Sequence, residues 1–232
     1  MSKSWPILCA IATLSLVTPA LADTRPVVVE LFTSQGCSSC PPADAVLRDL
    51  ATKPNVIALG FHVDYWDRLG WKDPLSAPGA TERQNAYAAQ FRSREIYTPQ
   101  IVVDGEKALV GSRRDEVFSA VSQAQPENAA PVSFAADNRS VSIGAGKGSG
   151  TVTLVRFARS RTTTIKAGEN AGRSLVDANG VIAIARLGAW NGASITIPID
   201  PPEPDQGIAV LVQATSGKML GAAITQGNDK KT

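Results

Sequence analysis

The sequence of 232 residues contains few of the residues on which several protein classes depend: 3 cysteines, 1 histidine and only 19% charged residues. Three cysteines cannot make a disulfide scaffold in a chain of this size. The low charge and the 44% hydrophobic content exclude a disordered chain, because there is enough apolar surface to build a core. A net charge of +2 provides no basic footprint for nucleic acid. We therefore expect a folded protein without a nucleic-acid partner.

The one long apolar run lies at the N-terminus. Lys3 precedes an apolar stretch that extends to Val17, and an Ala-Leu-Ala cleavage pattern ends at Ala22. This order predicts a secretory signal peptide over residues 1–22. A membrane anchor is the alternative, but the run is too short for a bilayer core of roughly 30 Å. Cleavage would remove Cys9 and release a periplasmic or secreted mature chain with no membrane span.

The pattern of the chain changes near residue 130. Before this point, short apolar strands alternate with amphipathic helices, which predicts an α/β domain with a mixed sheet and flanking helices over residues 23–126, with an insertion at about 65–95. After a linker, short strands separated by Gly, Pro, Asn and Asp predict a smaller all-β, sandwich-like domain over residues 131–227. The strands expected in this second domain are 132–135, 140–143, 151–157, 181–185, 194–199, 208–214 and 219–225.

The two cysteines left after cleavage, Cys37 and Cys40, form a CxxC motif between a predicted buried strand and a predicted helix. A structural zinc site needs four ligands, and the single histidine, His62, cannot complete one with this pair. The pair is therefore an inert disulfide or a redox-active one. Because a helix N-terminus lowers the pKa of a thiol, we predict that Cys37, the first and more exposed cysteine, is the nucleophile and that Cys40 resolves the mixed disulfide.

A second signal is the pair Thr98 and Pro99, which precedes a strand at 101–103 and an Asp-Gly hairpin turn. Alone, such a proline is explained as a strand-edge residue. Together with the CxxC motif, the stretch TPQIVVDGEKALVG resembles the thioredoxin superfamily over about residues 25–124. The resemblance implies a thioredoxin-like fold in which Pro99 is cis and Thr98 offers backbone hydrogen bonds to a substrate beside Cys37.

Two further polar residues lie on the strands around the motif. By the same resemblance, Glu30 would be the buried carboxylate that moves protons for Cys40, although it lies one residue further from Cys37 than is usual in thioredoxins. An exposed or N–H-bonded strand residue is the alternative explanation for Glu30. His62 would complete a copper site with the two cysteines, as in thioredoxin-like copper chaperones, or be a hydrogen-bonded structural histidine.

The insertion carries Trp66 and Trp71, which either form a substrate-facing lid or pin the insertion to its domain. The stretches HVDYWDRLGWKDP and FTSQGCSSCPPAD resemble a family of secreted bacterial proteins of unknown function that bear a thioredoxin-like domain, and this resemblance implies no particular activity. Farther along the chain, the stretch from Gly168 to Arg173 has the composition of a tight turn, with a ligand loop as the alternative.

These features predict a periplasmic or secreted thiol–disulfide oxidoreductase that needs no cofactor. Its substrate would be a protein thiol or disulfide bound at Thr98, Pro99 and Trp66, and a separate redox partner would regenerate it. Two alternatives stay open: a non-catalytic binding module with a static disulfide, and a copper carrier. All three fit export into an oxidising compartment.

Overall fold

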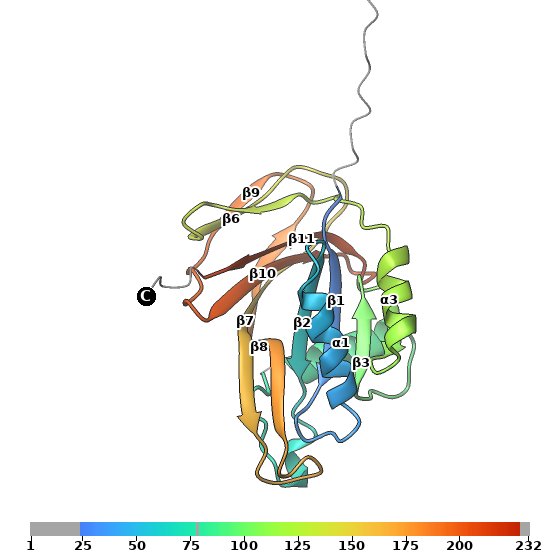
Figure 1. Ribbon diagram of the computed structural model, residues 1–232. Helices are drawn as coiled ribbons and strands as arrows, with labels where there is room; N and C mark the ends of the chain where they lie inside the picture. Colours follow the sequence, from blue (N-terminus) through green and yellow to red (C-terminus); the bar gives the residue numbers. More distant parts are fainter. Residues whose placement is uncertain (1–23, 78, 228–232) are drawn as a thin grey trace, which may run out of the picture.

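The computed structural model describes residues 24–77 and 79–227, so the expected signal peptide lies outside the described residues. Its centre is a mixed sheet of eight strands in the order β11-β10-β7-β8-β2-β1-β3-β4, and a second sheet has the order β5-β6-β9 (Figure 1). Within the described ranges, no helix is long and apolar enough to cross a membrane. In chain order the elements are β1 (Val27–Thr33), α1 (Pro41–Ala51), β2 (Val56–His62), η1 (Asp67–Leu69), α2 (Ala80–Gln90), β3 (Gln100–Val103), β4 (Lys107–Val110), α3 (Arg114–Gln123), β5 (Val132–Phe134), β6 (Ser140–Ile143), β7 (Gly150–Thr164), β8 (Ser174–Trp190), β9 (Ile195–Pro198), β10 (Gln206–Gln213) and β11 (Met219–Gln226).

The first half of the chain forms the strands and helices that its sequence predicts. β1 runs parallel to β2 and antiparallel to β3, and β3 turns tightly into β4. Asp104 and Gly105 at this turn have φ values of 53° and 72°, the left-handed conformation that a two-residue Asp-Gly hairpin loop requires. Every residue of β1 is buried, because this strand is central in the sheet.

Alternate residues of β1 point to opposite faces of the sheet. Val29 and Leu31 join an apolar core that includes side chains of α1 and α3. Val28 and Phe32 join the core on the other face, which includes side chains of α2. The α1 face and the α2 face are therefore separate environments, and Glu30 belongs to the α2 face.

The second half of the chain differs from the sandwich-like domain expected from its sequence, because β7, β8, β10 and β11 extend the large sheet. β8 joins β2 through the pair Gly180 and Gly60. β10 is buried on both faces: Ala209 packs into the core of the α2 face, and Val210 packs into a third core with the small β5-β6-β9 sheet. A strand that is buried on both faces, as β10 is, is typical of the interior of a sheet that is covered on both sides. The domain boundaries near residues 126 and 131 stay a prediction.

β7 and β8 are much longer than the strands expected at 151–157 and 181–185. They pair along their whole length, whereas β10 pairs with β7 only as far as Ala158. Their far ends therefore form a two-stranded ribbon that extends past the rest of the sheet (Figure 1). Polar residues dominate this part of β7, so it lacks the apolar signal of a strand. The loop that joins the ribbon, residues 165–173, lies at the same end of the molecule as the β1–α1 loop (Figure 1).

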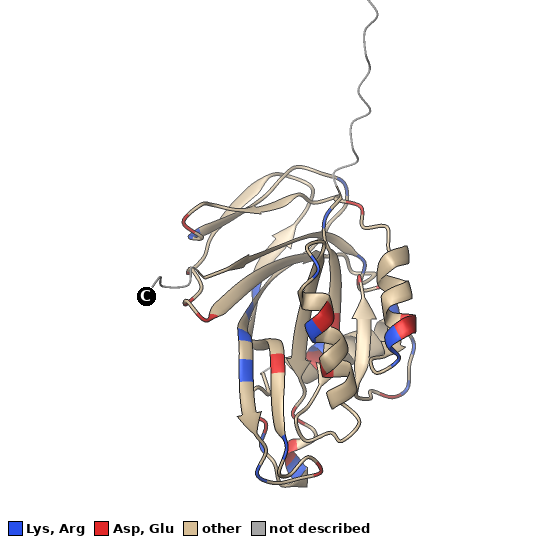
Figure 2. Ribbon diagram, in the orientation of Figure 1, with Lys and Arg blue, Asp and Glu red and all other residues tan. Residues whose placement is uncertain are grey.

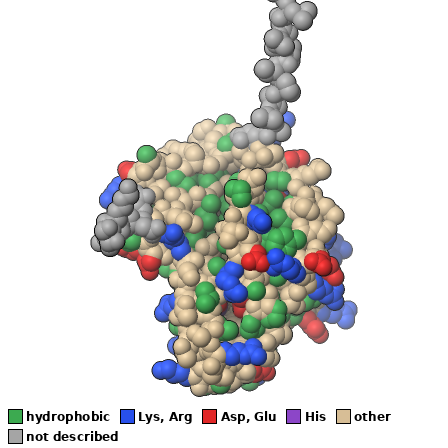
Figure 3. Space-filling view, in the orientation of Figure 1, with side chains coloured by type: hydrophobic (Ala, Val, Ile, Leu, Met, Phe, Trp, Pro, Cys, Tyr) green, Lys and Arg blue, Asp and Glu red, His purple; other side chains and the backbone are tan. Residues whose placement is uncertain are grey.

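Charged side chains lie mostly on the outside of these layers. Figure 2 shows both signs on α1 and at the far end of the β7–β8 ribbon. Figure 3 shows that basic and acidic side chains are interspersed on this face, with apolar side chains between them. Arg114 of α3 pairs with Asp49 of α1, and both side chains are exposed. The face seen in Figure 3 therefore has no large patch of one charge.

Candidate functional site

The site begins in the loop between β1 and α1. Cys37 and Cys40 form a disulfide, with their Cα atoms 5.4 Å apart. Cys40 is the N-cap residue of α1, and Pro41 and Pro42 follow in the first turn, where backbone N–H groups have no partner within the helix. The N–H of Asp44 donates to the carbonyl oxygen of Cys40 and begins the helical hydrogen bonding. The motif therefore lies at the positive end of the helix dipole, as predicted.

Thr98 and Pro99 lie beside the disulfide. The Thr98–Pro99 peptide bond is cis, as the resemblance implies. The hydroxyl of Thr98 donates to Cys37 Sγ at 3.4 Å and accepts a hydrogen bond of 2.8 Å from Trp66 Nε1. Trp66 thus pins its own loop to the site and also fixes the hydroxyl group that touches the sulfur. The structure brings these four predicted site residues together.

Both cysteines are fully buried, with 0% of either side chain exposed. The expected difference in exposure between Cys37 and Cys40 is therefore absent in this structure. The Thr98 hydroxyl lies against Cys37 Sγ with the Trp66 indole bonded to it, and the loop 165–173 is hydrogen-bonded to the backbone of the motif. Because both cysteines are buried, a partner sulfur cannot reach Cys37 until some of the groups around it move.

We call residues 165–173 the cap, because this loop binds the backbone around Cys37. Nδ2 of Asn170 donates to the carbonyl oxygens of Gln35 and Cys37, each at 2.9 Å. The carboxylate of Glu169 accepts a hydrogen bond of 3.0 Å from the N–H of Ser38. The sequence correctly predicts a turn here, but the contacts with the motif join residues 131 to 135 positions apart, for which the sequence contains no local signal.

A buried cluster of ionisable side chains lies on the α1 face next to the motif: His62, Asp73, Asp177 and Asp44. His62 Nδ1 is 2.8 Å from Asp73 Oδ2, and His62 Nε2 is 3.8 Å from Asp177 Oδ1. Gln35 connects the cluster to the motif loop. Its backbone N–H donates to Asp73 at 2.7 Å, and its side-chain amide donates to Asp177 at 2.8 Å. We call this group the aspartate–histidine cluster.

The pKa values of the cluster follow from burial and from the excess of carboxylates. Burial raises the pKa of Asp44 to about 7, although the charge of His62 and a 2.7 Å hydrogen bond from the Thr33 hydroxyl oppose the shift. Burial opposes the charge of His62, but the hydrogen bond and charge of Asp73, with the other carboxylates, outweigh it and raise the pKa to about 9. Burial also raises the pKa of Asp177. Asp44 can therefore gain or lose a proton near neutral pH.

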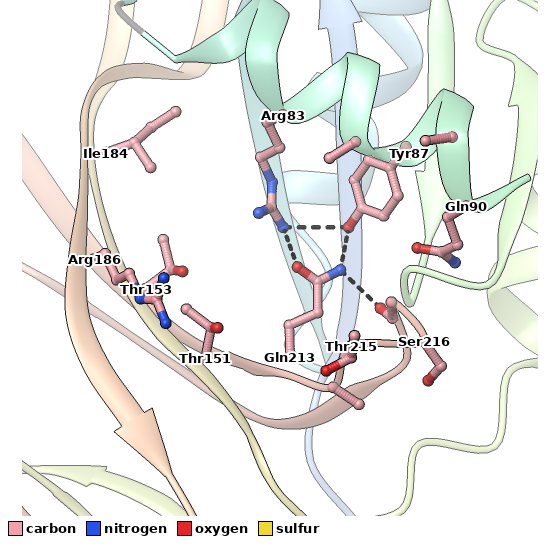
Figure 4. Close-up of a pocket in the computed structure, with 14 residues that line it drawn as sticks. Arg83, Tyr87, Gln90, Thr151, Thr153, Ile184, Arg186, Gln213, Thr215 and Ser216 are labelled. Carbon is pink, nitrogen blue, oxygen red and sulfur yellow. Dashed lines mark hydrogen bonds between the residues drawn. The ribbon is translucent and has the colours of Figure 1, made fainter.

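Glu30 is buried, as the resemblance implies, but its carboxylate lies on the α2 face, away from α1. Arg83 of α2 holds it with two hydrogen bonds, Nε to Oε2 at 2.9 Å and Nη2 to Oε1 at 2.6 Å. Arg83 also donates to Tyr87 and Gln213, each at 3.2 Å, where its guanidinium group lines a cavity of about 740 Å³ (Figure 4). The structure therefore places Glu30 in an ion pair and does not bring it to the cysteines.

His62 is likewise separated from the sulfurs, because both of its ring nitrogens face carboxylates. This is the hydrogen-bonded structural histidine that the sequence offered as the alternative to a copper ligand. Among the residues that the structure describes, no group of three or more His, Cys, Asp or Glu side chains has a metal-holding arrangement.

The family model described as "Protein of unknown function (DUF1223)" matches residues 28–213. The chain belongs to this family. A crystal structure of a protein from Agrobacterium tumefaciens is similar to it, with 34% identity over 90% of this chain and 98% of that chain and a TM-score of 0.76. HBP35 of Porphyromonas gingivalis is 14% identical over 90% of this chain and 78% of that chain, with a TM-score of 0.58, which is a likeness of fold. The comparison with curated proteins found no match.

The DUF1223 match includes the CxxC motif, Thr98, Pro99, the cap and the aspartate–histidine cluster. Of the site residues that sequence reasoning missed in this DUF1223 chain, Asp44 had a local signal, because it is an acidic residue one turn after Cys40. Asp177 had none, because it reaches the motif from β8. Asn170 lies in the stretch from Gly168 to Arg173 for which a turn was predicted, but nothing in that stretch indicated its contact with the motif.

Proposed function

We propose that this protein is an exported thiol–disulfide oxidoreductase with a thioredoxin-like arrangement of its first half. The observation that carries the proposal is the setting of the disulfide at the N-terminus of α1, with the Thr98 hydroxyl 3.4 Å from Cys37 Sγ. A helix N-terminus and a hydroxyl donor both stabilise a thiolate at Cys37, which is the reactive species in exchange. The apolar N-terminal run that extends to Val17 and the Ala-Leu-Ala pattern that ends at Ala22 support export to the periplasm or beyond.

In the reaction, the Cys37 thiolate attacks one sulfur of a partner disulfide. A Cys37–partner S–S bond forms, the partner's own S–S bond breaks, and its other sulfur leaves as a thiolate. Cys40 then loses its proton, and its thiolate attacks Cys37 Sγ and expels the first partner sulfur. The cysteine pair gives two electrons to the partner and ends as the Cys37–Cys40 disulfide. The same steps in reverse oxidise a partner dithiol.

Cys40 must lose a proton in the second step, and we assign Asp44 as its acceptor. Asp44 lies four residues after Cys40, so both side chains lie on the same side of α1. A carboxylate with a pKa of about 7 exchanges protons efficiently at neutral pH. Glu30, to which the resemblance gave this role, already pairs with Arg83 on the other face of the sheet.

A second candidate function is a binding module with a static disulfide. The complete burial of both sulfurs favours it, because a permanently covered disulfide does not exchange. The two candidates differ in the reduction potential of the pair and in whether it turns over.

The test measures the reduction potential of the pair and the turnover of insulin disulfides by the mature protein. We expect turnover by the wild type and by Ser119→Ala, a control on α3 away from the site, and none by Cys37→Ser. Cys40→Ser should accumulate a mixed disulfide between Cys37 and the substrate, because the resolving thiol is missing. A potential below about −300 mV, together with no turnover by the wild type, would overturn the proposal in favour of the static disulfide.

A further inference from the structure

The cap is hydrogen-bonded to the backbone around the buried Cys37, and these contacts indicate which partner could take its place. Resting on the proposed function, we infer that Asn170 and Glu169 determine specificity: they select an extended polypeptide as the partner thiol or disulfide. Three properties of the cap support this role, namely its hydrogen bonds, its charge and its attachment.

The cap satisfies three main-chain groups on either side of Cys37. Asn170 donates to the carbonyl oxygens of Gln35 and Cys37, and Glu169 accepts from the N–H of Ser38. Asn170 is 1% exposed, and its Oδ1 accepts a hydrogen bond of 3.1 Å from Arg173, which fixes the direction of its amide. A partner that covers Cys37 in place of the cap has to replace these bonds, since buried unpaired carbonyl and N–H groups oppose binding.

An extended polypeptide supplies the missing bonds because its backbone carries alternating N–H donors and carbonyl acceptors. It can donate to the two freed carbonyls and accept from the freed N–H while its own cysteine lies beside Cys37. A small thiol without peptide groups can attack the sulfur but has no backbone with which to replace the cap. The uncovered groups therefore favour a polypeptide over a small thiol.

The negative charge of Glu169 also favours displacement of the cap before the Cys37 thiolate forms. Hydrogen bonds from the Ser38 side chain and N–H lower the pKa of Glu169, so its carboxylate remains an anion. In this position it occupies the N–H of Ser38, the residue after Cys37, and places a negative charge beside the motif. Displacing the cap removes this charge and leaves the positive helix end to the thiolate.

The attachment of the cap allows such a displacement without unfolding. The N–H of Ile165 donates to the carbonyl of Arg173, and the N–H of Gly172 donates to the carbonyl of Ile165, which closes the loop on itself. The loop continues only into the two-stranded ribbon of β7 and β8, which extends past the sheet (Figure 1). These internal bonds do not involve the motif, so they can persist when the bonds of Asn170 and Glu169 to the motif are broken.

The test follows the initial rate at which a thiol forms a mixed disulfide with the oxidised mature protein, read by mass spectrometry after an acid quench. The attacking thiolate forms a bond to Cys37 Sγ and Cys40 leaves as a thiolate, so no other oxidant is needed. The probes are 2-mercaptoethanol, a peptide with one central cysteine, and the same peptide methylated on the backbone nitrogens that flank its cysteine. The proteins are the wild type, Asn170→Ala, Glu169→Gln and the control Asn191→Ala, which changes an asparagine beyond the opposite end of β8.

We expect the peptide to react with the wild type about tenfold faster than 2-mercaptoethanol at equal thiolate concentration, and methylation to abolish the advantage. Asn170→Ala should raise the 2-mercaptoethanol rate by about tenfold and the peptide rate much less. Glu169→Gln should raise the 2-mercaptoethanol rate and lower the pKa of the Cys37 thiol in the reduced protein, a readout that a purely structural role would not move. Asn191→Ala should match the wild type.

Equal rates for the methylated and unmethylated peptides would overturn the inference, and so would an unchanged 2-mercaptoethanol rate in Asn170→Ala. The methylated peptide probes the wild type, so this arm does not depend on the folding of a variant. Cap-dependent rates without any insulin turnover would overturn the proposed function alone. Insulin turnover with cap-independent rates would overturn the cap's role alone.

Discussion

Two buried sets of charged side chains lie on opposite faces of the central sheet, and they differ in how their charges are balanced. On the α2 face, Glu30 and Arg83 form a pair with one charge of each sign and two hydrogen bonds. On the α1 face, His62 is surrounded by the carboxylates of Asp73, Asp177 and Asp44. Successive side chains of β1 and of β2 point to opposite faces, so each of these strands contributes side chains to both faces.

The balance of charge decides what each set can do. In the Glu30–Arg83 pair each charge has a partner of opposite sign and hydrogen bonds, which is the arrangement of a structural ion pair. A buried cluster with more carboxylates than cations cannot keep every carboxylate ionised, so its protons move with pH and with neighbouring charges. The set beside the disulfide is the unbalanced one, which is why we assign proton transfer to Asp44 and a structural role to Glu30.

The largest effect is expected when the pair of Glu30 and Arg83 is broken. Arg83→Met leaves the buried Glu30 carboxylate without its partner, and we expect it to lower the free energy of unfolding by about 3–5 kcal/mol. Chemical denaturation measures this change. Arg114→Met, which breaks an exposed pair with Asp49, is the control and should change stability by less than about 1 kcal/mol. Insulin turnover per folded molecule should stay unchanged in Glu30→Gln; slower turnover at unchanged stability would return the proton-transfer role to Glu30.

The next effect tests the unbalanced cluster. Asp44→Asn removes the group that accepts the proton of Cys40, so resolution of the mixed disulfide should slow by about 100-fold at neutral pH. The initial attack of Cys37 should keep its rate, and rapid quenching of the mixed disulfide separates the two steps. Asp49→Asn, on the exposed side of α1, is the matched control. Equal slowing of both steps would contradict a role of Asp44 at Cys40.

A third test uses the pH dependence of stability. The pKa of His62 is about 9 in the folded protein, against the ordinary histidine value of 6.5 that applies in the unfolded chain. Its stabilising contribution is therefore fully present below about pH 6.5 and is lost as the pH rises through about 9. We expect the wild type to lose roughly 2.5 kcal/mol over this range. Urea unfolding at a series of pH values should show this slope in the wild type and not in His62→Gln. An identical slope in both proteins would show that the imidazole is not the titrating group.

The smallest effect is expected for Trp66, which is hydrogen-bonded to the Thr98 hydroxyl beside the disulfide. Trp66→Phe removes the indole hydrogen bond to the Thr98 hydroxyl but keeps an aromatic ring, so stability should fall by about 1 kcal/mol and turnover by a few-fold. Trp71→Phe removes a comparable bond to Gln35 on the cluster side and serves as the comparison. Unchanged turnover in Trp66→Phe would leave Trp66 only the role of pinning its loop.

Local patterns were sufficient to predict the helices and strands of the first half of the chain. Continuous apolar runs predicted β1 and β2, and the Asp104-Gly105 turn predicted the β3–β4 hairpin, because these signals act between near neighbours in the sequence. The same reasoning failed where a strand was polar: the far end of β7 contains Ser, Arg and Thr, and its pairing with β8 depends on the partner strand.

The sequence by itself determined the CxxC pair of Cys37 and Cys40 and its place at the start of a helix, because both depend on residues a few positions apart. That Pro99 stands beside the pair followed from the resemblance, since the two lie about 60 positions apart in the chain. Only the tertiary structure decided that Glu30 pairs with Arg83, that Asp177 joins His62, and that Asn170 binds the backbone of Cys37. The physical reason is the order of the strands: the large sheet places β8 beside β2, and this brings groups 142 positions apart, such as Gln35 and Asp177, within 2.8 Å.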